Sequence, residues 1–153
     1  EDDFNKYKVA RTNEKAINEI KILFPNKNIF SFELNKSDLS ARDNALHLDC
    51  CFQPIGKNKA IIYEGGFKNY DDVLFITEKF GDDNLIRISR EEMYNMNSNI
   101  FSISENVIVS ENGFKRLNRL LSEQGFIVEE IKFSEIAKME GLLRCTTLPL
   151  QRR

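Results

Sequence analysis

Three short stretches of the sequence carry side chains that could do chemistry. In an extended strand, His47 and Asp49 face the same side, so an imidazole that moves protons would stand beside a carboxylate that binds a cation. Cys145 lies in a Thr-containing segment after a glycine, and a cysteine is a nucleophile where its pKa is lowered or a base is near. Arg11 precedes a predicted helix, and a guanidinium there could bind a carboxylate.

Each stretch also has a simpler interpretation. The pair at positions 47 and 49 could be polar side chains on a partly exposed hairpin. Cys145 could be a small packed side chain of a buried strand, and Arg11 could be a solvated surface residue. Spacing alone does not bring His47 to Cys145, so the residue types leave both interpretations open.

Composition argues against several other classes of protein. The chain has one histidine and no CxxC motif, which argues against a metal site. Its three cysteines include an adjacent pair, a poor disulfide framework that favours a reducing, cytoplasmic location. A net charge of -2 without a long basic run argues against a nucleic-acid partner. Apolar runs are far too short for a membrane span.

The predicted elements form a repeat of strand, strand, helix and strand. Turn signals and periodicity define one copy over residues 46–88 and another over 98–133. The first copy has strands at 46–54, 60–63 and 85–88 around a helix at 69–80. The second has strands at 99–103, 107–109 and 126–133 around a helix that is capped by Asn112 and stopped by Gly125.

The two ends of the chain look like incomplete copies. A helix over 13–24 with Thr12 as its N-cap and a strand over 28–34 resemble a copy without its first strand. Residues 142–150 resemble one further strand. Because such units share their cores and unpaired sheet edges invite pairing, we expect one partial domain over 1–153. A missing N-terminal part or a second copy would complete it.

Three motifs carry a family resemblance. LHLDCCF at 46–52, EGLLRCTTLPL at 140–150 and ARTNEKA at 10–16 resemble segments of the pentein superfamily. That superfamily includes dimethylarginine dimethylaminohydrolases, arginine deiminases and amidinotransferases. Asn99 opens a segment that resembles a strand approaching the substrate. The resemblance covers nearly the whole chain and corresponds to the C-terminal part of these enzymes.

The resemblance implies a fold and a chemistry. The fold is an α/β propeller of five strand-strand-helix-strand units, of which this chain would supply about three. Cys145 would attack the guanidinium carbon, His47 would act as acid and base, and Asp49, Arg11 and Asn99 would bind the substrate. No metal or organic cofactor is needed.

The activity that this implies is hydrolysis of arginine or a methylated arginine to a citrulline-type product. An amidinotransferase that passes the amidine to an acceptor amine, and a non-catalytic binding or assembly module, are the alternatives. The resemblance places the acidic partner of the histidine upstream of Glu1, so we expect the 153-residue chain alone to be inactive.

Overall fold

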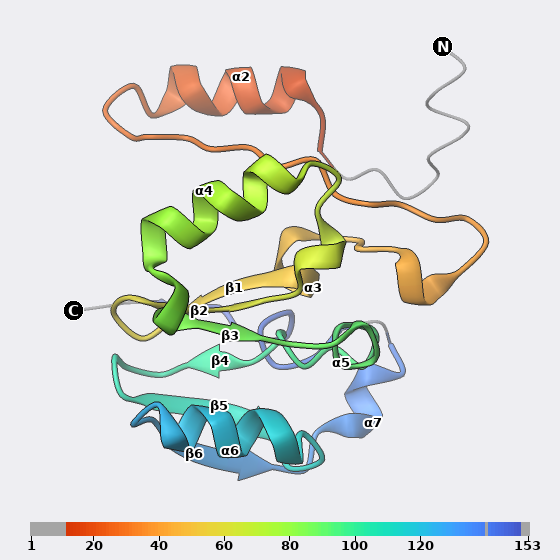
Figure 1. Cartoon of the computed structure of the whole chain (residues 1–153), viewed down its shortest axis with the longest axis vertical. Helices are drawn as coiled ribbons and strands as arrows, with labels where there is room; N and C mark the ends of the chain where they lie inside the picture. The colour runs from red at the N-terminus through yellow and green to blue at the C-terminus, as the bar shows by residue number, and fades with distance from the viewer. Residues whose placement is uncertain (1–11, 140, 151–153) are drawn as a thin grey trace.

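The computed structural model describes residues 12–139 and 141–150 and contains two small sheets built on one plan. The first has the order β1 (Phe52–Ile55), β2 (Lys59–Ile62) and β3 (Leu85–Arg87), and the second has β4 (Phe101–Ser102), β5 (Val107–Glu111) and β6 (Ile127–Ile131). In each sheet the first two strands are antiparallel and the last two are parallel. Figure 1 shows the two sheets one above the other. The predicted strand-strand-helix-strand repeat is therefore confirmed twice.

Each sheet is covered by the helix that connects its parallel strands. Helix α4 (Tyr70–Phe80) crosses over the first sheet, and α6 (Lys115–Glu123) lies against the second (Figure 1). Gly81 ends α4 with a φ of 82°, a left-handed conformation that glycine adopts without strain. Shorter elements complete the described chain: η1 (Ala41–Asp43), α3 (Leu48–Cys51), η2 (Glu64–Gly66), η3 (Asp82–Asn84), α5 (Arg90–Tyr94) and α7 (Ser134–Ala137).

One apolar core joins the two repeats. Ile61 and Ile62 of the first sheet and Ile108 of the second are all fully buried, as are Leu117 and Leu121 on α6. They belong to one continuous cluster of buried side chains, as expected for units that share their interior. None of the described helices is long and apolar enough to cross a membrane.

The N-terminal repeat is less regular than predicted. Helix α2 (Glu14–Leu23) confirms the helix, but Asn13 caps it in place of Thr12, because the Asn13 side chain accepts the N–H of Ala16 at 3.0 Å. The strand predicted at 28–34 is wrong: the segment makes only an isolated bridge between Leu34 and Phe67. Phe30 packs its ring on Phe75 of α4 instead.

Near the candidate site, the strand predicted over 46–54 is only partly confirmed and the strand predicted over 142–150 is wrong. Residues 48–51 form the helical turn α3, so β1 begins at Phe52. This turn inserts the buried Cys51 against Gly66, where an added Cβ would lie only 2.5 Å from the Cys51 Cβ. In the tail, residues 143–146 form a turn. There the Thr146 N–H donates to the Leu142 carbonyl at 3.1 Å, which uses backbone groups that a strand would offer to a neighbour.

The predicted N-cap of α6 is wrong as well. Asn112 lies in a turn directly after β5, where its N–H donates to the Ile131 carbonyl at 2.9 Å. The Glu111 carboxylate then accepts the N–H of Gly113, and the helix begins only at Lys115. The β5–α6 junction is therefore a short loop with a buried carboxylate in it.

Candidate functional site

Asn99 holds the segment that carries Cys145. The Asn99 Nδ2 donates to the Cys145 Sγ at 3.0 Å. The Asn99 Oδ1 accepts the backbone N–H groups of Arg144 at 2.9 Å and of Cys145 at 3.3 Å. Asn99 is only 4% exposed, whereas Cys145 is exposed. The geometry fixes the backbone around the thiol and leaves the sulfur accessible to a ligand.

The same asparagine joins Cys145 to Asp49. Its Nδ2 lies 3.5 Å from the Asp49 Oδ2, so an acidic side chain and the sulfur meet at one amide. The Asp49 Oδ1 is buried and has no hydrogen-bond partner within the part of the chain that the structure describes. A buried carboxylate oxygen without a donor is costly, and a ligand with N–H groups would satisfy it.

Ser98 fixes α3 at this position. The fully buried Ser98 hydroxyl lies 2.8 Å from the Asp49 carbonyl and 2.7 Å from the Cys50 carbonyl. A hydroxyl has one proton to donate, which these two carbonyls share. Ser98 was not among the residues predicted from the sequence, where its place beside Asn99 is the one signal that points to it.

The roles predicted for His47 and Arg11 remain predictions. His47 is exposed and immediately precedes α3, two residues before Asp49. Its backbone N–H lies 3.5 Å from the Cys50 Sγ. A shared cleft for the His47 ring and the Cys145 sulfur stays a prediction. Asp49, two residues after His47, is joined to Cys145 through Asn99. Arg11 lies outside the described residues.

The three cysteines differ in accessibility. Burial raises the pKa of Cys51 to about 12 and also raises the pKa of Cys50. Both therefore remain thiols at neutral pH, while Cys145 is the exposed one. An electrophile that enters the site meets Cys145. Within residues 12–139 and 141–150, no group of three His, Cys, Asp or Glu side chains could hold a metal ion.

The substrate-binding role predicted for Asn99 also remains a prediction. The hydrogen bonds of its side chain go to Asp49, Arg144 and Cys145. These contacts give the amide a positioning role that the sequence did not suggest. A substrate that contacts Asn99 would have to share an amide that is already hydrogen-bonded to Asp49, Arg144 and Cys145.

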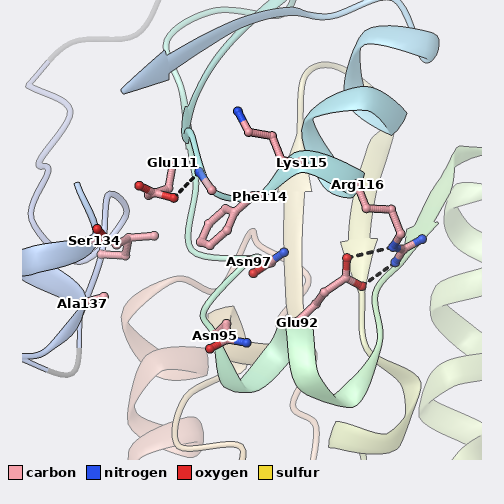
Figure 2. Close-up of a pocket in the computed structure, with 11 residues that line it drawn as sticks. Glu92, Asn95, Asn97, Glu111, Phe114, Lys115, Arg116, Ser134 and Ala137 are labelled. Atoms are coloured by element: carbon pink, nitrogen blue, oxygen red, sulfur yellow. Dashed lines mark hydrogen bonds and ion pairs between the residues drawn. The ribbon is translucent and has the colours of Figure 1, made fainter. Parts of the chain in front are cut away.

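A cavity of about 530 Å³ lies elsewhere. It is bounded by the turn after α5, the β5–α6 junction and α7 (Figure 2). Asp49, Asn99 and Cys145 do not line it. The chemical groups of the candidate site and this hollow are therefore separate features of the surface.

Comparison with known proteins identifies relatives over nearly the whole chain. The family model for "N,N dimethylarginine dimethylhydrolase, eukaryotic" matches residues 7–152. The uncharacterised protein YkgA of Bacillus subtilis is 31% identical over 142 residues, which are 93% of this chain and 46% of that protein. An arginine deiminase of Streptococcus sanguinis is 25% identical over 171 residues, with 93% of this chain and 42% of that protein covered. The chain thus spans less than half the length of these two relatives.

Solved structures share the fold. The product-bound N-terminal domain of ArgZ, a cyanobacterial arginine dihydrolase, superposes with a TM-score of 0.78 at 22% identity, over 93% of this chain and 49% of that chain. SxtG, an amidinotransferase from Microseira wollei, gives 0.72 at 18% identity, over 93% and 40%. These likenesses show that the chain shares the α/β propeller fold of those structures.

Proposed function

Because the chain belongs to the N,N dimethylarginine dimethylhydrolase family of the pentein superfamily, we propose that it modifies a guanidino group. The proposed reaction is hydrolysis of arginine or a methylated arginine through a covalent adduct on Cys145. A citrulline-type ureido product is released. The observation that carries this proposal is the meeting of the Asp49 carboxylate and the Cys145 sulfur at the Asn99 amide.

The electrostatics around Asp49 suit a guanidinium. Its Oδ1 is buried without a donor in the described part of the chain, and a guanidinium offers several N–H groups in one plane. A ligand bound there would place its central carbon toward the neighbouring sulfur. Pairing with a cation would also offset the cost of burying the carboxylate.

The proposed reaction has two steps. The Cys145 thiolate bonds to the guanidinium carbon, the C–N bond to the departing amine breaks, and His47 gives that amine a proton. Water then adds to the same carbon and gives a proton to His47, and the C–S bond breaks. The thiolate returns and a ureido group leaves, so that one difficult step is divided into two.

Asn99 has a positioning role in this scheme. Its Nδ2 donates to the Cys145 sulfur at 3.0 Å, which fixes where the sulfur lies. Its Oδ1 holds the Arg144 and Cys145 N–H groups. Arg11 is proposed to bind the substrate carboxylate, as the resemblance implies.

Two other functions remain candidates. SxtG is an amidinotransferase, and an acceptor amine in place of water would make this chain one too. A non-catalytic binding or assembly module would keep the fold without turnover. We propose further that the fold and the acidic partner of His47 are completed by a missing N-terminal part or by a second copy.

The test is trapping of the adduct. The complete polypeptide is incubated with arginine, monomethylarginine or dimethylarginine, and products and intact protein are followed by mass spectrometry. The expected result is a ureido product and a transient mass increase on the peptide that contains Cys145. Added glycine that receives the amidine would instead favour the transferase.

Matched variants separate chemistry from binding. Cys145→Ala should bind these substrates and form neither adduct nor product. Cys50→Ala should keep both, because Cys50 is held as a half-buried thiol. Binding without turnover by the unaltered protein would favour the non-catalytic module, and neither binding nor turnover with any guanidino or ureido compound would contradict the proposal.

A further inference from the structure

The open hollow at the β5–α6 junction, which is separate from the candidate site, has the size of a small-molecule site. Its volume is about 530 Å³, within the usual range for such sites. Figure 2 shows Asn97 among the lining residues, between Glu111 and Phe114 on one side and Glu92 on the other. The elements that form it meet only in the folded chain.

Two polar side chains of this hollow are nearly buried and leave polar atoms open to it. Asn97 is 5% exposed, and its side-chain amide has no hydrogen bond to another described residue. Glu111 is 4% exposed, and its Oε2 accepts the Gly113 N–H at 2.5 Å within the described chain. Neither residue belongs to the described buried atoms that lack any partner, so these polar atoms reach the solvent of the hollow, where a ligand with N–H donors can bind them.

The described ion pairs around the hollow involve every charged lining residue except Glu111. Arg116 is committed to Glu92, with its Nε 2.8 Å from the Glu92 Oε1, and its Nη2 also donates to the Arg87 carbonyl at 2.9 Å. Lys115 pairs with Glu130 at 3.0 Å. Among the described lining residues, the Glu111 carboxylate is then the charge without a counter-ion.

We propose that this cavity is a second binding site, for a small cation that carries several N–H donors, such as an alkylammonium or guanidinium group. The Glu111 carboxylate is its counter-ion, and the Asn97 side-chain oxygen and the Ser134 hydroxyl accept further hydrogen bonds. The Phe114 ring covers the apolar part of the ligand. The site does not include Asp49 or Cys145 and stands independently of the proposed reaction.

The proposed site is lined by residues of the two segments that hold the Cys145 sulfur. Asn97 is two residues before Asn99, and the fully buried Leu142, which also lines the cavity, is three residues before Cys145. A ligand in the cavity therefore contacts both segments that hold the sulfur. These are the segments whose backbone amides report its binding most directly.

The experiment is an amide NMR titration of the 153-residue chain carrying Cys145→Ala, which excludes covalent chemistry. The probes are methylguanidinium and butylammonium, with neutral methylurea as the control ligand. Both cations should give saturable shifts at the Gly113 and Asn97 amides, and methylurea should give none there. Asp49→Asn should leave these shifts unchanged, which separates this site from the proposed active site.

Glu111→Gln is the decisive variant. It keeps an oxygen for the Gly113 N–H and removes the charge, so the cations should bind at least tenfold more weakly. Asn97→Ser should also weaken binding, whereas Glu130→Gln, on the exposed partner of Lys115, should not. Equal affinity in Glu111→Gln, shifts confined to the Asp49 and Asn99 segments, or no saturable shift at Gly113 overturns the proposal.

Discussion

The Asn99 Nδ2 lies 3.0 Å from the Cys145 Sγ and 3.5 Å from the Asp49 Oδ2. One buried amide thus touches a candidate nucleophile and a candidate cation binder from segments about fifty residues apart on either side. Two of the predictions below depend on this contact.

The first prediction concerns Asn99→Ala. The side chain that holds the Cys145 sulfur and the Arg144 and Cys145 N–H groups is then lost. The thiol is no longer held in place, so its alkylation by iodoacetamide should speed up by several-fold, for about 1 kcal/mol lost per hydrogen bond. The rate is measured on the Cys145 peptide by mass spectrometry and requires no substrate. Asn58→Ala, in the exposed turn between β1 and β2, is the control and should react at the unaltered rate. An alkylation rate in Asn99→Ala equal to that of the control would contradict the positioning role proposed for Asn99.

The second prediction concerns Asp49→Asn, for which stability and binding should move in opposite directions. The Asp49 Oδ1 is buried without a donor, and a neutral amide there is less costly to bury. The melting temperature should therefore stay the same or rise. Arginine binding to a Cys145→Ala background should weaken by roughly 2–3 kcal/mol, the cost of removing one partner of a buried ionic contact. Calorimetry measures both, and a large loss of stability with unchanged affinity would make Asp49 a structural residue.

The third prediction uses the pKa of Cys51. Burial raises it from 9.0 to about 12 in the folded chain. Between these values the unfolded chain loses the proton that the folded chain keeps, so stability falls as pH rises through this window, by at most about 1.4 kcal/mol per pH unit. Urea unfolding at several alkaline pH values should show a shallower decline for Cys51→Ala than for the unaltered chain. Cys145→Ala, at the exposed cysteine, should keep the steep decline.

The reliable predictions from sequence were those set by local signals. The helix over 69–80 was found because acidic residues begin it and Gly81 ends it, and α4 runs over Tyr70–Phe80. The hairpin at 56–59 was found because Gly56 permits the turn, with a φ of 55°. Both depend on residues within a few positions of one another.

The errors arose where distant contacts decide local structure. Alternation over 46–54 predicts a strand, but burying Cys51 against Gly66 turns residues 48–51 into α3. The tail at 142–150 lacks a strand because its amides bond within the turn and to Asn99. The cavity around Glu111 and Asn97 could not be predicted at all, since its walls come from separate elements.

The fourth prediction concerns Arg116, which joins α6 to α5 and β3. Its guanidinium bonds the Glu92 carboxylate and the Arg87 carbonyl. Its side chain is 46% exposed, so solvent screening limits the loss in Arg116→Met to roughly 1 kcal/mol. Arg119→Met, which breaks only the exposed contact to Glu123, should cost less, as thermal unfolding of both variants would show.

The pH dependence of that loss has a definite sign. The hydrogen bond from Arg116 lowers the pKa of Glu92, so the pair stabilises the fold above the ordinary glutamate pKa. The contribution is lost as pH falls through the folded-state pKa. The difference between Arg116→Met and the unaltered chain should therefore shrink on acidification, and a difference that grows would contradict the assignment.

The last prediction concerns the apolar face of α2. Ile20, Leu23 and Phe24 are 41%, 70% and 53% exposed, and no residue of α2 is buried. If a second copy completes the fold, this face and the sheet edges are where it binds, and sedimentation of the 153-residue chain should show a dimer. Leu23→Lys should then shift the equilibrium toward monomer, because a charge in an apolar contact is costly. Leu39→Lys, at a fully exposed loop leucine, should not. A clean monomer at all concentrations would refute pairing between copies and leave a further part of the same polypeptide as the partner for this face.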